Sequence, residues 1–157
     1  MTATPLQVVN VAQLGTSANA TIIQWHVVAM FAPSFFTGNL IQRYGIIKIL
    51  MVGLIAYIVA MITALAGDRF LHYLAALFLL GLGWNFLYIG GSALVASVAT
   101  AEEKGRVQGV ADLATTSLVA LASLSAGGLH SQFGWDIFIL AGCVLVAILA
   151  CCLSWLG

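Results

Sequence analysis

Long apolar runs separated by short polar breaks make up the hydrophobic pattern of this chain. A helix needs about 20 apolar residues to cross a bilayer, and five runs meet that length. They cover residues 22–41, 46–66, 70–99, 107–129 and 135–155. A shorter piece at 2–14 contains Pro5 and three amide side chains, so we expect it to be only part of a spanning helix. The pattern predicts five full transmembrane helices and a clipped first one.

The breaks between the runs predict where the chain bends. Pro33 lies in the middle of the 22–41 run, where it removes a backbone hydrogen bond and should kink the helix. Residues 15–19 are rich in turn-forming side chains and predict a loop before this run. Residues 130–134 predict a reversal between the last two runs.

Composition excludes several protein classes. The chain is 62% apolar and 6% charged, with no net charge, whereas soluble domains are about 25% charged. So few charges cannot cover a surface that faces water, and the high hydrophobicity excludes intrinsic disorder. Without a basic patch to neutralise phosphates, we expect no nucleic-acid partner. The fold class predicted is an all-α integral membrane protein in contact with a lipid bilayer.

Loop charges predict the orientation of the spans. The loops after the second and fourth runs share one side of the membrane because two crossings separate them. They carry Arg43, Lys48, Lys104 and Arg106. The loops on the opposite side carry only Arg69. The positive-inside rule places the more basic side, and with it the C-terminus, in the cytoplasm. We expect a multi-pass protein of the cell (inner) membrane.

One face of the 107–129 run collects small and polar side chains at helical spacing. They are Asp112, Thr115, Thr116, Ala120, Ser123 and Gly127. Small residues let helices approach closely, so we expect this face to pack inward. An acid inside a membrane is costly and either pairs or lines a wet path. Asp112 is therefore a candidate for the substrate path, and a local ion pair with Lys104 or Arg106 is the alternative.

Three further side chains are candidates for the substrate path. Asn85 and Trp84 in the 70–99 run could hydrogen-bond and stack a ligand, or they could hold two helices together. His26 could titrate near neutral pH and serve a proton-coupled step, or it could form an interfacial hydrogen bond. No catalytic set, metal-ligand spacing or phosphate-binding loop stands out. We expect no enzymatic activity, no cofactor and no metal.

Two loops resemble those of a known family. The first reads Gly38-Asn-Leu-Ile-Gln-Arg-Tyr-Gly45. It resembles the signature Gly-x-Leu-x-Asp-Arg-x-Gly-Arg-Lys of the major facilitator superfamily of secondary transporters. Gln42 stands in place of the acid, and Ile46 and Ile47 stand in place of the basic pair. The second loop, Ala-Glu-Glu-Lys-Gly-Arg-Val-Gln-Gly at 101–109, resembles the family's Pro-Glu-Glu-Arg-Gly-Arg-x-Gln-Gly. Stretches 26–38 and 83–91 resemble an uncharacterised bacterial branch, so the resemblance covers almost the whole chain.

The resemblance implies a fold and an activity. Family members have two six-helix halves that rock around a central site, and this chain resembles the C-terminal half. The implied gate-loop residues are Gly38, Arg43, Gly45, Glu102 and Glu103. The resemblance also implies that Arg43 pairs with Glu102 or Glu103.

The implied function is transport of a small solute as part of a secondary transporter. The first and fourth helices of each half mostly line the path in this family, which favours Asn85 over Asp112. One half lacks the opposite wall of the path, so we expect the missing N-terminal half or a second copy as a partner. The alternative is a small multi-span module that only assembles with other membrane proteins.

Overall fold

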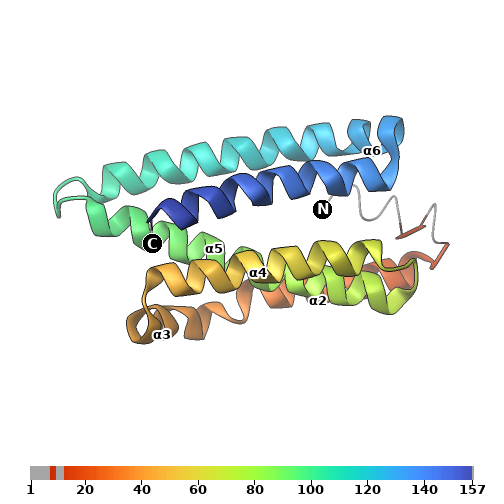
Figure 1. Ribbon diagram of the computed structural model, residues 1–157, viewed down its shortest axis with the longest axis horizontal. Helices are drawn as coiled ribbons and strands as arrows, with labels where there is room; N and C mark the ends of the chain where they lie inside the picture. The colour runs from red at the N-terminus through yellow and green to blue at the C-terminus, as the bar shows by residue number, and fades with distance from the viewer. Residues whose placement is uncertain (1–7, 10–12, 157) are drawn as a thin grey trace.

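The computed structural model describes residues 8–9 and 13–156, with side chains described in these ranges except at 126–139, 141 and 154–156. The longer regular elements within these ranges are all helices. They are α2 (Thr16–Phe31), α3 (Ser34–Tyr44), α4 (Ile46–Leu65), α5 (Phe70–Val98) and α6 (Lys104–Leu156). Figure 1 shows them lying lengthwise beside one another. The all-α class is confirmed, and the clipped helix predicted at 2–14 lies mostly outside the described residues.

Helices α2 and α3 form one span that is broken at Pro33. The two helices are bent by 42° relative to each other, so the predicted kink is present. Helix α2 begins at Thr16, where the turn-forming residues at 15–19 had predicted a loop. Gly15, with φ 83°, precedes the helix, and the Thr21 hydroxyl donates to the Ser17 carbonyl inside it, 3.1 Å away. Polar residues that favour loops are also common in the first turn of a helix, which explains the difference.

Helices α4 and α5 pack closely because glycines lie where they cross. A Cβ on Gly83 would lie 2.9 Å from the backbone oxygen of Gly53, and a Cβ on Gly90 would lie 2.8 Å from Leu50 Cδ2. Small residues of this kind let transmembrane helices approach and gain dispersion contacts. At 1.5 Å per residue, the 29 residues of α5 extend about 43 Å, which is longer than the apolar core of a bilayer.

Helix α6 doubles back on itself, as Figure 1 shows in its light-blue part. We call Lys104–Ser125 its first arm and Gly142–Leu153 its second arm. The second arm packs on α4, where Val146 and Leu153 join Leu50 and Leu54 in one apolar cluster. The first arm is different, because its most apolar stretch has none of its residues buried.

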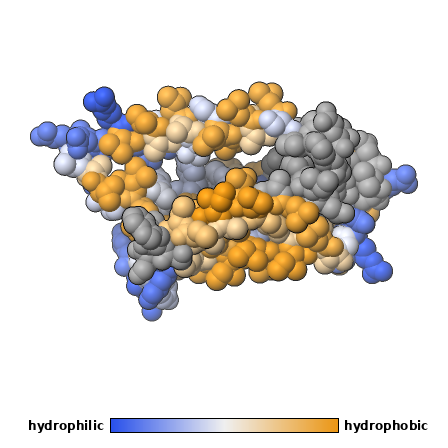
Figure 2. Space-filling view, turned by 45° about the horizontal axis from the view of Figure 1, so that its top comes forward, coloured by the Kyte–Doolittle hydropathy of each residue, from blue (hydrophilic) through white to orange (hydrophobic). Residues whose placement is uncertain are grey.

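The outside of the helices is apolar. Phe35, Val98 and Leu124 are 80–84% exposed. Figure 2 shows hydrophobic residues along the middle of the visible face and hydrophilic residues gathered at both ends. Among the described residues, three helices are long and apolar enough to cross a membrane, or four when α2 and α3 count as one span. The chain is therefore a multi-pass membrane protein.

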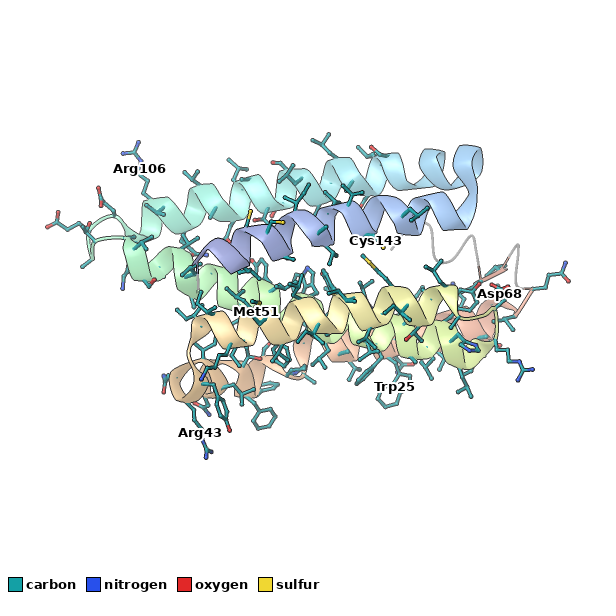
Figure 3. The ribbon with its side chains drawn as sticks, in the orientation of Figure 1. Trp25, Arg43, Met51, Asp68, Arg106 and Cys143 are labelled. Carbon is teal, nitrogen blue, oxygen red and sulfur yellow. The ribbon has the colours of Figure 1, made fainter. Side chains whose placement is uncertain are left out.

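The loops alternate between the two ends of the helices. Arg43 and Arg106 lie at one end in Figure 3, and Asp68 lies at the other. Helix α6 ends on the same side as Arg43 and Arg106 in Figures 1 and 3. Loops separated by two crossings thus share a side of the molecule.

Candidate functional site

Helix α5 carries two groups of polar contacts, one with the broken span and one with the first arm of α6. We call the first group the clasp; it consists of Asn85, Met30, Ser34 and Thr37. We call the second group the array; it consists of Tyr88, Ser92, Gln108 and Asp112. Both contain residues that the sequence indicated as candidates for a substrate path.

Asn85 is the centre of the clasp and is fully buried, with 0% of its surface exposed. Its Nδ2 donates to the Met30 carbonyl at 2.7 Å and to the Ser34 hydroxyl at 2.6 Å. Its Oδ1 accepts a hydrogen bond from Thr37 Oγ1 at 2.7 Å. Both ends of the amide are thus engaged, with partners on both sides of Pro33.

The clasp forms where the helix ladder is interrupted. In a continuous helix the Met30 carbonyl would accept the backbone N–H of Ser34, four residues later. Here α2 ends at Phe31 and α3 begins at Ser34, so the Met30 carbonyl lies in the last turn of α2. The Asn85 amide supplies a donor to this carbonyl from the neighbouring helix.

His26 makes a second polar contact between α2 and α5. It is 4% exposed, and its Nδ1 lies 2.6 Å from the Leu77 carbonyl. A carbonyl only accepts, so Nδ1 must carry the proton. Gly81 makes room for the contact, because a Cβ there would lie 2.6 Å from the His26 carbonyl and 3.3 Å from Nδ1.

The array joins α5 to the first arm of α6. Gln108 Nε2 lies 2.7 Å from Ser92 Oγ and 3.2 Å from Asp112 Oδ1 and donates to both. The Tyr88 hydroxyl donates to the same Asp112 oxygen at 3.5 Å. On each helix the two residues are four positions apart and therefore share a face. These partners of Asp112 are neutral side chains, not Lys104 or Arg106.

A strip of aromatic rings leads from α2 to the array. The rings of Trp84 and Tyr88 are stacked, with centroids 4.7 Å apart and planes inclined by 6°. Phe31 meets Trp84 edge to face at 6.1 Å. Tyr88 is 40% exposed, and Asp112 is half-buried, so this end of the strip is accessible in the chain.

Sequence reasoning missed Gln108, which contacts two members of the array. The available signal was its spacing, because an amide four residues before an acid on a helix commonly bonds to that acid. Its contact with Ser92 depends on how α5 and α6 pack and has no local signal.

The gate-loop residues lie at the end of the helices that carries Arg43 and Arg106 in Figure 3. Gly45 joins α3 to α4 with φ 89°, a conformation that favours glycine. The Arg43 guanidinium lies 5.5 Å from the centre of the Tyr44 ring. Glu103 accepts a hydrogen bond from Thr100 at 2.7 Å. Arg43 and Glu103 thus each contact a nearby side chain, and the pairing of Arg43 with Glu102 or Glu103 that the resemblance implies stays a prediction. Gly38 lies within α3, and Glu102 lies in the turn before α6.

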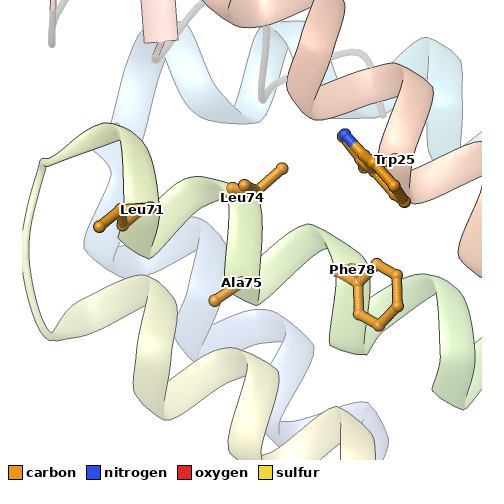
Figure 4. A pocket seen from close by; sticks show the side chains of 5 residues that line it. All are labelled: Trp25, Leu71, Leu74, Ala75 and Phe78. Atoms are coloured by element: carbon orange, nitrogen blue, oxygen red, sulfur yellow. The ribbon is translucent and has the colours of Figure 1, made fainter.

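A separate apolar pocket of about 450 Å³ lies where α2 faces the first half of α5 (Figure 4). Its lining residues are Trp25, Leu71, Leu74, Ala75 and Phe78. The rings of Trp25 and Phe78 are 6.5 Å apart across it. Apart from the indole N–H, these side chains offer no hydrogen-bonding group, so the pocket suits hydrocarbon and not a polar solute.

Metal binding has no support in the described part of the chain. Among those residues, no group of three His, Cys, Asp or Glu side chains comes close enough to hold an ion.

Comparison with known proteins decides the family. A family model described as Major Facilitator Superfamily matches residues 2–157. The chain belongs to the major facilitator superfamily. Its relatives are named as transporters, which supports the expectation of a non-enzymatic protein. No solved structure matches it.

Three curated relatives illustrate the match. The riboflavin transporter RfnT of Brucella anthropi is 43% identical over 95% of this chain and 38% of its own length. Two uncharacterised transporters of this superfamily from Bacillus subtilis, YdeG and YddS, are 34% and 30% identical over 71% and 90% of this chain. The matches cover 25% and 33% of those two proteins. The chain thus spans at most about two fifths of the length of the curated relatives it matches.

Proposed function

We propose that this chain is the C-terminal half of a secondary transporter that moves a small solute by alternating access. Family membership supports the fold, and the array supports a path through it. An acid, an amide and two hydroxyls lie together between two helices whose outer surfaces are apolar. Polar groups are costly in a membrane and commonly mark the route of a solute or ion.

The exposed apolar surface of the first arm of α6 supports the proposal that the chain has a partner. The arm's most apolar stretch has no buried residue, although its small face suits close packing. The hydrogen bonds of the array join this arm to α5. We propose that the missing N-terminal half, or a second copy of the chain, covers this surface.

The alternative, a module that assembles without transporting, predicts a different native product. The denatured mass of the protein in its own membranes distinguishes the two. A band near 16.5 kDa would support a separately made chain, as the alternative of a non-transporting module requires. A band more than twice as heavy would support a complete two-half transporter.

We also propose that the more basic loops face the cytoplasm of a cell whose inner membrane holds the protein. The end of α3 and the first turn of α6 carry three of the five basic residues, Arg43, Lys104 and Arg106, and Arg43 and Arg106 lie at one end of the helices. The positive-inside rule assigns that end to the cytoplasm. A reporter protein that is active only in the cytoplasm should therefore be active when it is fused after α6.

The proposed solute is riboflavin or a similar flavin. Support comes from the 43% identity to a relative named as a riboflavin transporter. The accessible end of the aromatic strip supports it independently, because a flavin has a flat ring system with polar edges. Solutes of this kind bind in sites with apolar walls and a few polar groups.

Uptake of labelled riboflavin by cells that produce the full-length protein tests this function. We expect uptake above that of cells carrying an empty vector, and competition by unlabelled riboflavin but not by an unrelated sugar. Uptake equal to the empty vector, with the protein present in the membrane, would contradict riboflavin as the solute.

A further inference from the structure

We propose that Tyr88 and Asp112 form a binding site for a planar heteroaromatic solute that carries an N–H donor on its edge. This inference rests on the proposed transport function and assigns the residues that recognise the solute. Tyr88 is the platform for the ring, Asp112 accepts from its edge, and Gln108 orients Asp112.

The stack of Trp84 on Tyr88 leaves one face of the Tyr88 ring for another ring. Trp84 covers one face at a centroid distance of 4.7 Å, and Tyr88 remains 40% exposed. Three residues further along α5, a Cβ on Gly91 would meet no atom within 4 Å. Trp84 lies one turn before Tyr88, so the position with room for a side chain lies on the other side of Tyr88 along α5. A flat solute placed there continues the stack, which aromatic rings favour.

The edge of such a solute lies near a group that only accepts hydrogen bonds. The Tyr88 hydroxyl is 3.5 Å from Asp112 Oδ1, so a ring stacked on Tyr88 brings its own edge toward this carboxylate. An ionised carboxylate has no proton to donate and must meet an N–H or O–H group. The imide N–H on the ring edge of a flavin meets this requirement.

Asp112 has capacity for a further donor. Its hydrogen bonds from Gln108 and Tyr88 measure 3.2 and 3.5 Å, whereas bonds to ionised groups are commonly about 2.7–2.9 Å. Gln108 is better fixed, since its amide also donates to Ser92 at 2.7 Å. A solute N–H can therefore form the shortest bond to Asp112 without breaking the bridge between α5 and α6.

The test measures riboflavin binding to the purified full-length protein by quenching of flavin fluorescence, which ring stacking causes. Tyr88→Leu and Asp112→Asn should each weaken binding at least tenfold. Phe35→Leu and Asp68→Asn are matched controls, because Phe35 is 84% exposed and Asp68 lies at the opposite end from Arg43 and Arg106. Both controls should bind riboflavin within twofold of the unmodified protein.

A second probe identifies the edge contact. In 3-methylriboflavin a methyl group replaces the imide proton, so the ring remains but the donor is lost. The unmodified protein should bind this compound about tenfold more weakly than riboflavin. In Asp112→Asn the difference between the two compounds should fall below threefold, whereas Tyr88→Leu should preserve it.

The outcomes separate this site from the transport function. Riboflavin uptake with unchanged binding in both variants would overturn the site and leave transport standing. Binding that depends on both residues, without any uptake, would support the site and contradict transport of riboflavin. Absence of quenching with the unmodified protein would overturn the site as well.

Discussion

The clasp and the array are both polar contacts of α5, but one is closed and the other is open. In the clasp, Asn85 is 0% exposed and its three bonds measure 2.6–2.7 Å. In the array, Tyr88 is 40% exposed and the bonds to Asp112 measure 3.2 and 3.5 Å. A buried side chain whose polar atoms all form short hydrogen bonds holds helices together. A more exposed side chain with long hydrogen bonds can instead form hydrogen bonds with a solute.

The membrane sharpens this difference. Water is absent from the apolar core of a bilayer, so a polar group that loses its protein partner has no replacement there. The break at Pro33 leaves the Met30 carbonyl without its helical donor, and the Asn85 amide donates a hydrogen bond to it instead. The array has no backbone group to satisfy. We infer that Asn85 serves the fold and that Asp112 serves the solute.

The largest expected effect is the loss of the clasp. Asn85→Leu keeps much of the side-chain volume but leaves the Met30 carbonyl without the Asn85 donor. An unsatisfied buried group, together with the lost hydrogen bonds, should lower the free energy of unfolding by about 3 kcal/mol. The measurement is the unfolding midpoint of the full-length protein in detergent.

The array supplies the matched comparison for Asn85→Leu. Gln108→Leu removes the amide that bridges two helices, yet the Ser92 and Asp112 side chains it leaves are half-buried and less costly to expose. We expect a loss below about 1 kcal/mol. Normal stability of Asn85→Leu with loss of riboflavin binding would instead assign Asn85 to the solute.

The next effect concerns how closely α2 approaches α5. Gly81→Ala places a Cβ 2.6 Å from the His26 carbonyl and 3.0 Å from Ala29 Cβ, so the helices must separate. Overpacking of this kind costs about 2 kcal/mol and should also lengthen the contact between His26 and Leu77. Unfolding in detergent measures the cost.

Gly91→Ala is the control on the same helix, because its Cβ meets no atom within 4 Å. Alanine favours a helix over glycine, so the unfolding free energy should stay equal or rise by up to about 1 kcal/mol. Equal destabilisation by both changes would contradict close contact at Gly81.

A smaller effect is expected at His26. His26→Phe removes the donor to the Leu77 carbonyl, but that carbonyl lies within α5, where the backbone N–H of Gly81 is its helical partner. With no group left unsatisfied, the loss should be about 1 kcal/mol in unfolding free energy. If riboflavin uptake is abolished while stability falls only this far, His26 has a role in transport beyond holding α2 to α5.

Sequence patterns predicted the spans and the kink because both depend on local properties. Apolar length defines a span, and Pro33 breaks a helix wherever it lies in one. The clasp could not be predicted, because Asn85 and Met30 are 55 positions apart in the chain. They meet only when α5 and α2 pack with these two residues at the same height. Sequence reasoning therefore named Asn85 as a candidate without separating its two roles. For Gln108, the spacing to Asp112 was a local signal that was missed, but its shorter bond, to Ser92 on α5, could not be predicted for the same reason.

The smallest effect separates the ring of Tyr88 from its hydroxyl. Tyr88→Phe keeps the stack on Trp84 and removes only a hydrogen bond to Asp112 whose length, 3.5 Å, marks it as weak. Riboflavin binding should change less than threefold, against at least tenfold for Tyr88→Leu. If Tyr88→Phe weakens binding as much as Tyr88→Leu, the hydroxyl itself fixes Asp112. The array would then resemble the clasp, because the position of each side chain would depend on its hydrogen bond to the neighbouring one.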